Sequence, residues 1–301
     1  MSGLEHIEDQ LKKPLIRWAG GKRSIVPTLL SFLPEKYGCY FEPMLGGGAL
    51  FFAISPNAAV ITDINPELIN FYKVIKQKPQ QFREAIKELR ALKTTYKKFR
   101  KSSPSVSLER AVRFFYLIRL SWNGVYRVNR RGEFNVPFGA RRPKTLITRE
   151  SIVAASKALR GARLLCGDFE KTTDDVKAGD LVYLDPPYPK GAEANNGFNR
   201  YHPTKFILKD HKRLSTHAER LANKGAYVLI TEAASEEILA LYNNCFQVHF
   251  IESHSLIAAD TEARGKVQEA IITSYSPKQP FKSTVSSDIA REAKCPGPLA
   301  R

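Results

Sequence analysis

The tetrapeptide Asp185-Pro186-Pro187-Tyr188 directly follows the apolar run from Leu181 to Leu184. Proline fixes φ and carries no backbone N–H, so the prolines leave the carbonyl oxygen of Pro186 available as a hydrogen-bond acceptor. Asp185 adds a side-chain acceptor, and Tyr188 adds a flat aromatic face. Two acceptors beside a stacking surface suit the exocyclic amine of a flat base, which is the nucleophile in methyl transfer to an amino group. The alternative is a strand that simply ends in a proline-rich turn.

A second group of residues suits a nucleotide-like ligand. Gly46-Gly47-Gly48 lies between an expected strand and an expected helix, where glycines allow the backbone to approach a ligand closely, although the GxGxxG spacing is absent. Asp63 ends the next expected strand, which is the place of a ribose-binding acid, unless it only caps the following helix. Trp18 and Lys22 flank a Gly-Gly pair and suit a zwitterionic sulfonium ligand, with packing and solvation as the alternatives.

The hydrophobic pattern predicts the elements that position these groups. Short apolar runs predict strands at residues 40–43, 60–63, 162–166, 181–184, 227–231, 246–251 and 270–275. Helical periodicity predicts helices at residues 25–32, 49–54, 69–75, 82–92, 111–120, 149–159 and 209–223, and Asn65-Pro66 is expected to open the helix after Asp63. Strand, glycine loop, helix and acid-ended strand are typical of a Rossmann-like α/β fold, which the long charged helices interrupt as an insert.

We therefore expect two domains and a tail. Residues 1–68 and 161–278 form a discontinuous catalytic domain, residues 69–160 form the insert, and residues 279–301 form a disordered tail without periodicity. Within the insert, residues alternate around an Arg-Gly turn from Asn123 to Pro137, which predicts a β-hairpin with a basic tip.

Composition narrows the classes of partner. The chain of 301 residues has a formal charge of +17, a pI near 9.7 and 43% hydrophobic residues, enough for a sizeable core. A positive excess favours a polyanionic partner, with nucleic acid ahead of a membrane surface, over a solvated basic face. The four cysteines and the histidines show no metal-ligand spacing, so we expect reduced thiols and no metal. The N-terminus is not of the signal-peptide type and no apolar stretch reaches roughly 18 residues, which predicts a soluble, cytoplasmic protein without a membrane partner.

Five stretches of the chain resemble the Dam-type N6-adenine DNA methyltransferases, in which the cofactor motif precedes the recognition domain and the catalytic motif follows it. They occur in the family's order and comprise residues 16–22, 41–48, 63–65, 119–138 and 185–188. The resemblance implies an S-adenosylmethionine-dependent methyltransferase fold with a mixed sheet, in which residues 69–160 recognise the target. It also implies that Asp185 to Tyr188 hold the target adenine. The residues implied at the S-adenosylmethionine site are Trp18, Lys22, Phe41, Gly46, Gly48, Asp63 and Asp185.

Double-stranded DNA is the partner that the resemblance implies. A two-stranded ribbon fits the major groove, where arginine and asparagine read base edges and other cations grip phosphate; a solvated basic hairpin is the alternative. The expected DNA-binding residues are Asn123, Val125, Arg127, Arg130, Arg131, Pro137 and Arg141. The sequence Ala140-Arg141-Arg142 departs from the Arg-Tyr of the best-known relatives, so the target GATC is a leading hypothesis only. Arg264, Lys266 and Glu269 match a charged loop that the family uses near DNA, or they form a salt-linked surface turn.

The expected reaction is methyl transfer to adenine N6 after the base is flipped out of the duplex. Asp185 and the Pro186 carbonyl would orient the amine, Tyr188 would stack on the ring, and a loop containing Tyr201 would close over it. Two alternatives remain at this point. One is cytosine N4 methylation, which also uses an exocyclic amine, and the other is a DNA-binding regulator of the same fold without turnover. An RNA substrate has no support, because no RNA-binding module is visible. We expect a monomer, because one transfer per site needs one active site.

Overall fold

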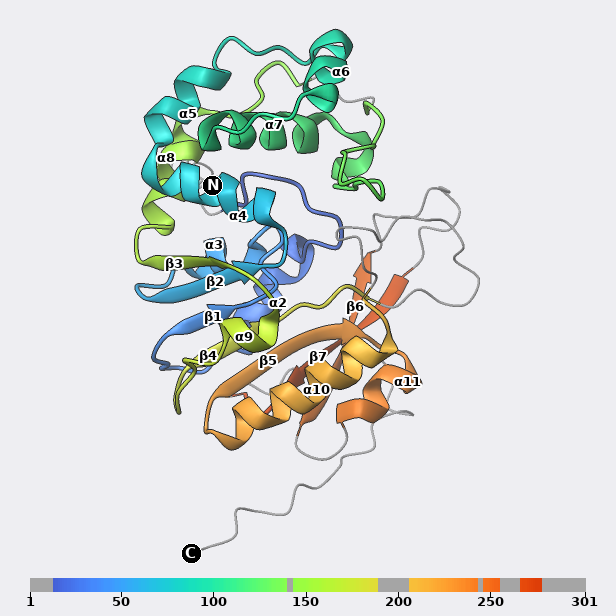
Figure 1. Cartoon of the computed structure of the whole chain (residues 1–301). Helices are drawn as coiled ribbons and strands as arrows, with labels where there is room; N and C mark the ends of the chain where they lie inside the picture. Colours follow the sequence, from blue (N-terminus) through green and yellow to red (C-terminus); the bar gives the residue numbers. More distant parts are fainter. Residues whose placement is uncertain (1–12, 140–142, 189–205, 243–245, 255–265, 278–301) are drawn as a thin grey trace, which may run out of the picture.

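The computed structural model describes residues 13–139, 143–188, 206–242, 246–254 and 266–277. Within them the chain forms a seven-stranded sheet in the order β3-β2-β1-β4-β5-β7-β6 (Figure 1). The strands are β1 (Tyr40–Glu42), β2 (Ala59–Asp63), β3 (Ala162–Cys166), β4 (Leu181–Leu184), β5 (Tyr227–Ala233), β6 (Gln247–His254) and β7 (Lys266–Thr273). The strands from β3 to β5 are parallel, whereas β7 is antiparallel to both β5 and β6. The predicted α/β fold with a mixed sheet is confirmed.

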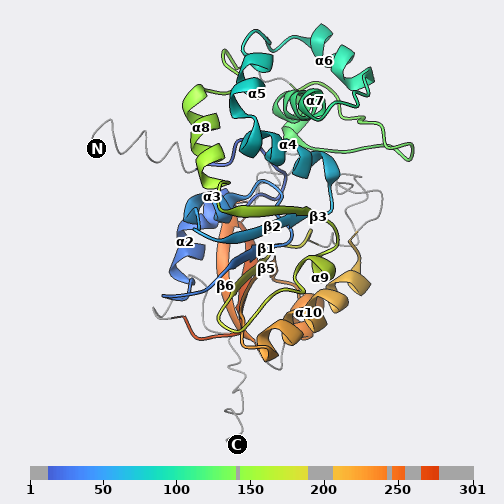
Figure 2. The same cartoon turned by 60° about the vertical axis from the view of Figure 1, so that its left-hand side comes forward.

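Helices cover both faces of this sheet (Figures 1 and 2). Helix α10 (Leu208–Asn223), with α9 (Phe169–Thr172), α11 (Glu236–Leu239) and η3 (Ala240–Tyr242), packs on one face, and η1 (Arg23–Ile25), α2 (Val26–Ser31) and α3 (Ala49–Ile54) lie on the other. Successive side chains of a strand point to opposite faces, so Val228 and Ile230 pack toward α10 while Leu229 joins the opposite cluster. Burial on both faces explains why the central parallel strand β4 is a continuous apolar run, whereas β3 at the edge carries the exposed Arg163.

The remaining helices gather beyond β3. They are α4 (Pro66–Gln77), α5 (Pro79–Ile86), α6 (Lys93–Lys101), α7 (Ser107–Leu120), η2 (Trp122–Gly124) and α8 (Arg149–Ala158). A single cluster of buried side chains includes both these helices and one face of the sheet, so the described residues do not separate into two cores along this boundary. The division into catalytic and recognition domains therefore stays a prediction, and the tail at residues 279–301 lies outside the described residues.

The predicted helix at residues 82–92 is wrong in its second half. Helix α5 ends at Ile86, and a short connection leads to α6, which was not predicted from the sequence. Tyr116 of α7 holds this connection, because its hydroxyl donates to the Arg90 carbonyl oxygen at 2.6 Å and accepts from the Leu92 N–H at 3.2 Å. The sequence of helix α6 is strongly basic and buries only Tyr96, so it lacks the apolar periodicity that predicts a helix.

The predicted β-hairpin at residues 123–137 forms an antiparallel return without regular strands. Its β-type pairing is limited, among the described residues, to the isolated bridges Ser121↔Phe138 and Val128↔Phe134. The apolar residues at the alternating positions 126, 134 and 136 are buried in the core cluster, so one side of the return faces the core. Backbone hydrogen bonds join the two arms, from the Asn129 N–H to the Glu133 carbonyl oxygen and from the Asn135 N–H to the Arg127 carbonyl oxygen, so the predicted hairpin forms, but without extended strands.

None of the helices in the described part of the chain combines the length and the apolar character needed to cross a bilayer.

Candidate active site

The glycine loop after β1 has a conformation that requires glycine. Gly46 and Gly48 have φ values of 48° and 68°, in the left-handed region that other residues rarely adopt. A Cβ atom on Gly46 would lie 2.7 Å from Cδ1 of Trp18, which is closer than real contacts allow. The Gly48 N–H closes the turn by donating to the Leu45 carbonyl oxygen at 2.7 Å. Backbone strain and close approach of the indole ring thus both select glycine at Gly46.

Asp63 at the end of β2 is bonded to this loop. Its Oδ2 accepts from the Gly46 N–H at 2.9 Å and its Oδ1 accepts from the Asn65 N–H at 2.8 Å. Burial raises the pKa of Asp63 to about 6, although these backbone donors oppose the rise. The cap of α4 is Asn65, whose Oδ1 accepts from the Glu67 and Leu68 N–H groups. The alternative that Asp63 caps the helix is therefore wrong.

Trp18 joins the loop to the helices beyond β3. Its ring stacks on Tyr126 with centroids 6.2 Å apart and an interplanar angle of 18°, and it lies 6.4 Å from the Phe114 ring. These contacts give Trp18 a packing role in the structure, and its expected contact with the cofactor stays a prediction. Phe41 also has a packing role, because its side chain is 3% exposed and belongs to the buried cluster on the α10 face of the sheet.

Asp185, directly after β4, is held by a cation and a hydroxyl. The Lys22 Nζ lies 3.0 Å from Asp185 Oδ1 and also donates to the Gly20 carbonyl oxygen at 2.9 Å. The Thr231 hydroxyl of β5 donates to the same Oδ1 at 2.8 Å. Burial raises the pKa of Asp185, and both Lys22 and Thr231 counteract that rise by stabilising the anion. Lys22 therefore pairs with Asp185, a carboxylate of the protein itself, whereas the sequence pattern predicts that it pairs with the carboxylate of a ligand.

Tyr188 lies beside this ion pair. The Lys22 Nζ is 4.1 Å from the centroid of the Tyr188 ring, and the Tyr188 hydroxyl donates to Oε2 of Glu269 at 2.7 Å. Burial, followed by the nearby Asp185 and Glu269 carboxylates, raises the pKa of Tyr188 well above its ordinary value, so the phenol keeps its proton. Pro186 is buried and Pro187 is exposed.

Glu269 is the residue of this cluster that the sequence pattern placed elsewhere. It was expected in a charged loop near DNA or in a surface turn, but it lies within β7 and its side chain is 13% exposed. In the sequence, Glu269 directly precedes the apolar run that starts at Ala270, and this position is the pattern that could have placed it in the strand. Lys266 begins the same strand, whereas Arg264 and Tyr201 lie outside the described residues.

Three acids lie at the carboxyl ends of three adjacent strands. Asp63 ends β2, Glu42 ends β1, and Asp185 follows β4, while β1 pairs with both neighbours. Glu42 is 2% exposed and accepts a hydrogen bond from Tyr40 at 2.7 Å; burial raises its pKa to about 8, with further contributions from Asp185 and Asp63. The order of the strands reverses between β1 and β4, and the carboxyl edge at such a point is where open α/β sheets bind ligands.

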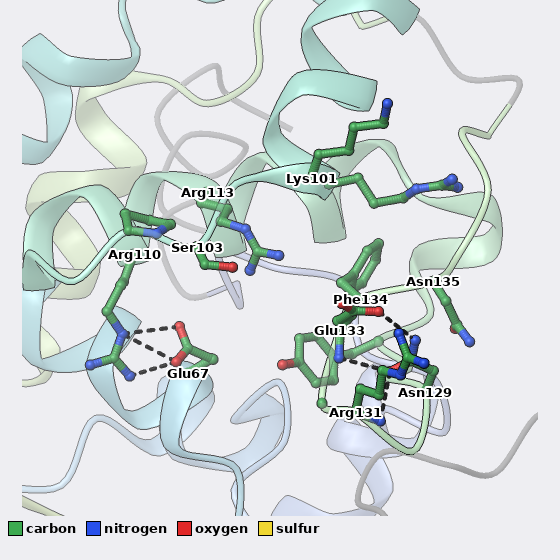
Figure 3. Close-up of a pocket in the computed structure, with 14 residues that line it drawn as sticks. Glu67, Lys101, Ser103, Arg110, Arg113, Asn129, Arg131, Glu133, Phe134 and Asn135 are labelled. Carbon is green, nitrogen blue, oxygen red and sulfur yellow. Dashed lines mark hydrogen bonds and ion pairs between the residues drawn. The ribbon is translucent and has the colours of Figure 1, made fainter.

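A basic cavity of 590 Å³ lies among α6, α7 and the antiparallel return (Figure 3). Its lining includes five cations, Arg100, Lys101, Arg110, Arg113 and Arg131, against the acids Glu67 and Glu133. Arg110 is paired with Glu67. Asn129 shapes the tip of the return, because its Oδ1 accepts from the N–H groups of Arg131 and Glu133 at 2.9 and 3.0 Å. Only Arg131 among these five cations was predicted from the sequence, because the other four come from helical segments.

The expected DNA-binding residues differ in exposure. The exposed ones are Asn123, Arg130, Arg131 and Pro137. Arg127 is half-buried and its Nε donates to Asn135 Oδ1 at 2.7 Å. Val125 is 3% exposed and belongs to the core cluster, so its side chain supports the return from inside. Arg141 lies outside the described residues.

Comparison with known proteins gives the family. Residues 18–256 match the model of the D12 class N6 adenine-specific DNA methyltransferases. The chain is 37% identical over 273 residues to the type II methyltransferase M1.LlaDCHI of Lactococcus lactis subsp. cremoris, covering 87% of this chain and 95% of that protein. It is 31% identical over 272 residues to the DNA adenine methylase of Escherichia coli strain K12, covering 88% and 96%. It is 30% identical over 287 residues to the type II methyltransferase M.MjaIII of Methanocaldococcus jannaschii, covering 87% and 99%. With the glycine loop, the acid-ended strands and the Asp185-Pro186-Pro187-Tyr188 tetrapeptide in place, the chain belongs to the D12 class of N6 adenine-specific DNA methyltransferases.

Proposed function

We propose that this DNA methyltransferase uses S-adenosylmethionine as its methyl donor and binds cofactor and target adenine side by side at the carboxyl edge of β2, β1 and β4. The observation that carries the proposal is the row of Asp63, Glu42 and Asp185 at the ends of these three adjacent strands. The glycine loop bonded to Asp63 forms the cofactor half, and Asp185 with Tyr188 forms the adenine half.

The residues of the cofactor half fit S-adenosylmethionine chemically. The Gly46 backbone lies against the Trp18 ring, and the Asp63 carboxylate bonded to it provides acceptors of the kind that bind ribose hydroxyls in such folds. The Asp63 carboxylate, with a pKa of about 6, would also complement the positive charge of a sulfonium at neutral pH. When bound, S-adenosylmethionine supplies the methyl group. Gly46, Gly48 and Asp63 would hold it, with Lys22 and Trp18 at its border.

Asp185 has the properties of an acceptor for the adenine amine. The bonds from Lys22 and Thr231 both go to Oδ1, and within the described residues Oδ2 makes no hydrogen bond. The amine would donate one N–H to Asp185 and the other to the carbonyl oxygen of Pro186. These bonds draw electron density onto N6 and fix its direction of attack. Alignment of this kind contributes roughly 7–11 kcal/mol in well-oriented reactions, so we assign Asp185 an orienting role.

Tyr188 would stack on the adenine after the base leaves the duplex. A base in the helix cannot reach a site at the edge of a sheet, so base flipping is required. Stacking on an aromatic side chain is worth on the order of 1–3 kcal/mol per base and offsets part of the unstacking cost. The cation of Lys22 over the Tyr188 ring keeps that ring in place before the base arrives.

Residues 69–160 are proposed as the target-recognition domain, with GATC as the first target to test. The cavity with five cations and two acids supports this role, because phosphate contacts dominate the affinity for DNA. Asn123, Arg127, Arg130 and Arg131 are the candidates for contact with base edges and phosphates. A monomer is the proposed active form.

The test is methylation of unmethylated duplex DNA with methyl-labelled S-adenosylmethionine, followed by nucleoside analysis and sequencing of modified sites. Wild-type protein should label N6 of adenine, and Asp185→Ala should abolish labelling. Asp175→Ala is the matched control, since Asp175 is an exposed acid paired with Arg163. Label on cytosine N4, or tight DNA binding without transfer by wild-type protein, would contradict the proposal. Modification outside GATC would refute only that target.

A further inference from the structure

We propose that Glu269 is a positioning residue for methyl transfer, which fixes the Tyr188 ring through its hydroxyl and shares Lys22 with Asp185. The inference rests on the proposed function, because it assigns a role within that site. It concerns a side chain of β7, outside the catalytic tetrapeptide.

Strand pairing brings Glu269 to the site. In the sheet, Glu269 lies opposite Ala233 of β5 and Ile251 of β6. Strand β5 separates β7 from β4, and the long carboxylate of Glu269 meets Tyr188, which follows β4. The connection therefore crosses strand β5 and joins residues 81 positions apart.

The contacts form a continuous polar network. Tyr188 donates to Glu269 Oε2 at 2.7 Å, and Lys22 Nζ lies 3.9 Å from the same oxygen. Lys22 is also 3.0 Å from Asp185 Oδ1 and 4.1 Å from the Tyr188 ring centroid. One lysine thus connects the two carboxylates and the aromatic face. Its side chain is 8% exposed, that of Glu269 13% and that of Asp185 19%, so solvent screening is limited.

This network explains how an aromatic side chain at the end of a loop can serve as a fixed stacking surface. A tyrosine that follows two prolines has a restrained backbone, but its side-chain torsions are set only by its neighbours. A hydrogen bond to a carboxylate is short and strong, and here it acts on the ring through its hydroxyl. Glu269 therefore holds the ring from its far end while Lys22 covers its face.

The same network keeps the acceptor in place. Without Glu269, Asp185 and the Gly20 carbonyl oxygen would hold Lys22, and it would shift from its position over the Tyr188 ring. The acceptor and the stacking face would then move independently. Misplacement by about 1 Å can cost on the order of 100-fold in rate.

The test compares Glu269→Ala, Glu269→Gln and Tyr188→Phe as full-length proteins, each with steady-state kinetics and with duplex DNA carrying 2-aminopurine at the target position. Glu269→Ala should lower kcat by about tenfold to 100-fold and change the fluorescence of the flipped base. The KM for S-adenosylmethionine should change much less. Glu269→Gln keeps an acceptor oxygen for Tyr188, so it should restore most of kcat.

A double-mutant cycle supplies the second measurement. Tyr188→Phe removes the hydroxyl but keeps the ring and the carboxylate, so it should reproduce part of the Glu269→Ala loss. The double variant should then lose less than the product of the two single losses. Gln268→Ala is the matched control, because this exposed neighbour on β7 points away from Glu269.

The outcomes separate this inference from the proposed function. Wild-type kcat and an unchanged 2-aminopurine signal in Glu269→Ala would overturn the positioning role, as would fully multiplicative losses in the cycle. A loss confined to the KM for DNA would also overturn it. Should Glu269→Ala fail to fold, Tyr188→Phe decides the question, because it removes the hydrogen bond to Glu269 from the other side, and a wild-type kcat with an unchanged 2-aminopurine signal in that variant would overturn the positioning role. Absence of adenine methylation by the wild-type protein would instead refute the proposed function.

Discussion

Replacing Gly46 by alanine should damage the cofactor half of the site while leaving the fold intact. At a φ of 48°, a residue with a Cβ carries a cost of about 1–2 kcal/mol. The new Cβ would also lie 2.7 Å from Cδ1 and 3.0 Å from Nε1 of Trp18. Overpacking of this kind costs about 1–3 kcal/mol. The indole cannot simply move aside, because it stacks on Tyr126.

Gly179→Ala separates these two costs. Gly179 has a φ of 81°, and a Cβ atom added there would have no neighbour within 4 Å, so only the backbone cost applies. The free energy of unfolding, measured by urea denaturation, should fall by about 1–2 kcal/mol for Gly179→Ala. It should fall by about 2–5 kcal/mol for Gly46→Ala. The difference of about 1–3 kcal/mol measures the contact with Trp18.

Binding of S-adenosylmethionine, measured by isothermal titration calorimetry, gives the functional readout. Gly46→Ala displaces the N–H that bonds Asp63, so we expect its affinity to fall by at least about tenfold, which is about 1.4 kcal/mol. Gly179→Ala should bind as the wild type does. Equal stabilities of the two variants together with unchanged binding by Gly46→Ala would refute both the steric argument and the place of the cofactor.

Three further predictions concern stability and DNA binding. Glu42 has a pKa of about 8 in the folded protein, against an ordinary value of 4.5. Its contribution to stability is therefore complete below pH 4.5 and is lost as the pH rises through about 8. In thermal melts at pH 9, Glu42→Gln should be more stable than the wild type, by at most about 5 kcal/mol. Glu232→Ala should lower the free energy of unfolding in urea by about 1–3 kcal/mol, because it leaves the buried His211 Nδ1 without the carboxylate oxygen that lies 2.8 Å away. The exposed Glu236→Ala should have little effect. Lys101→Gln should reduce the slope of log K against log salt concentration by about 0.9 in DNA-binding titrations if it contacts a phosphate, and an unchanged slope would contradict that contact.

The sequence alone determined those parts of the protein that depend on neighbouring residues. The apolar run before Asp185, the glycines after β1 and the acid that ends β2 are local patterns, and each of them predicts where a strand stops and a polar group begins. The order of strands and helices around the glycine loop followed from the same patterns, as did the basic character of the insert. Local patterns were less reliable where tertiary packing decides. Tyr116 holds a non-helical connection at Arg90 and Leu92, where the pattern predicts helix, and the expected hairpin forms with isolated bridges and no extended strands.

The tertiary structure alone decided which distant residues meet. Insertion of β7 between β5 and β6 brings Glu269 to Tyr188, and pairing of β1 with both β2 and β4 places Glu42 between Asp63 and Asp185. Trp18 likewise meets Tyr126 only because the helices beyond β3 pack against the glycine loop. The physical reason is that the position of a strand within a sheet results from the burial of both faces by the whole chain. No window of adjacent residues contains that information.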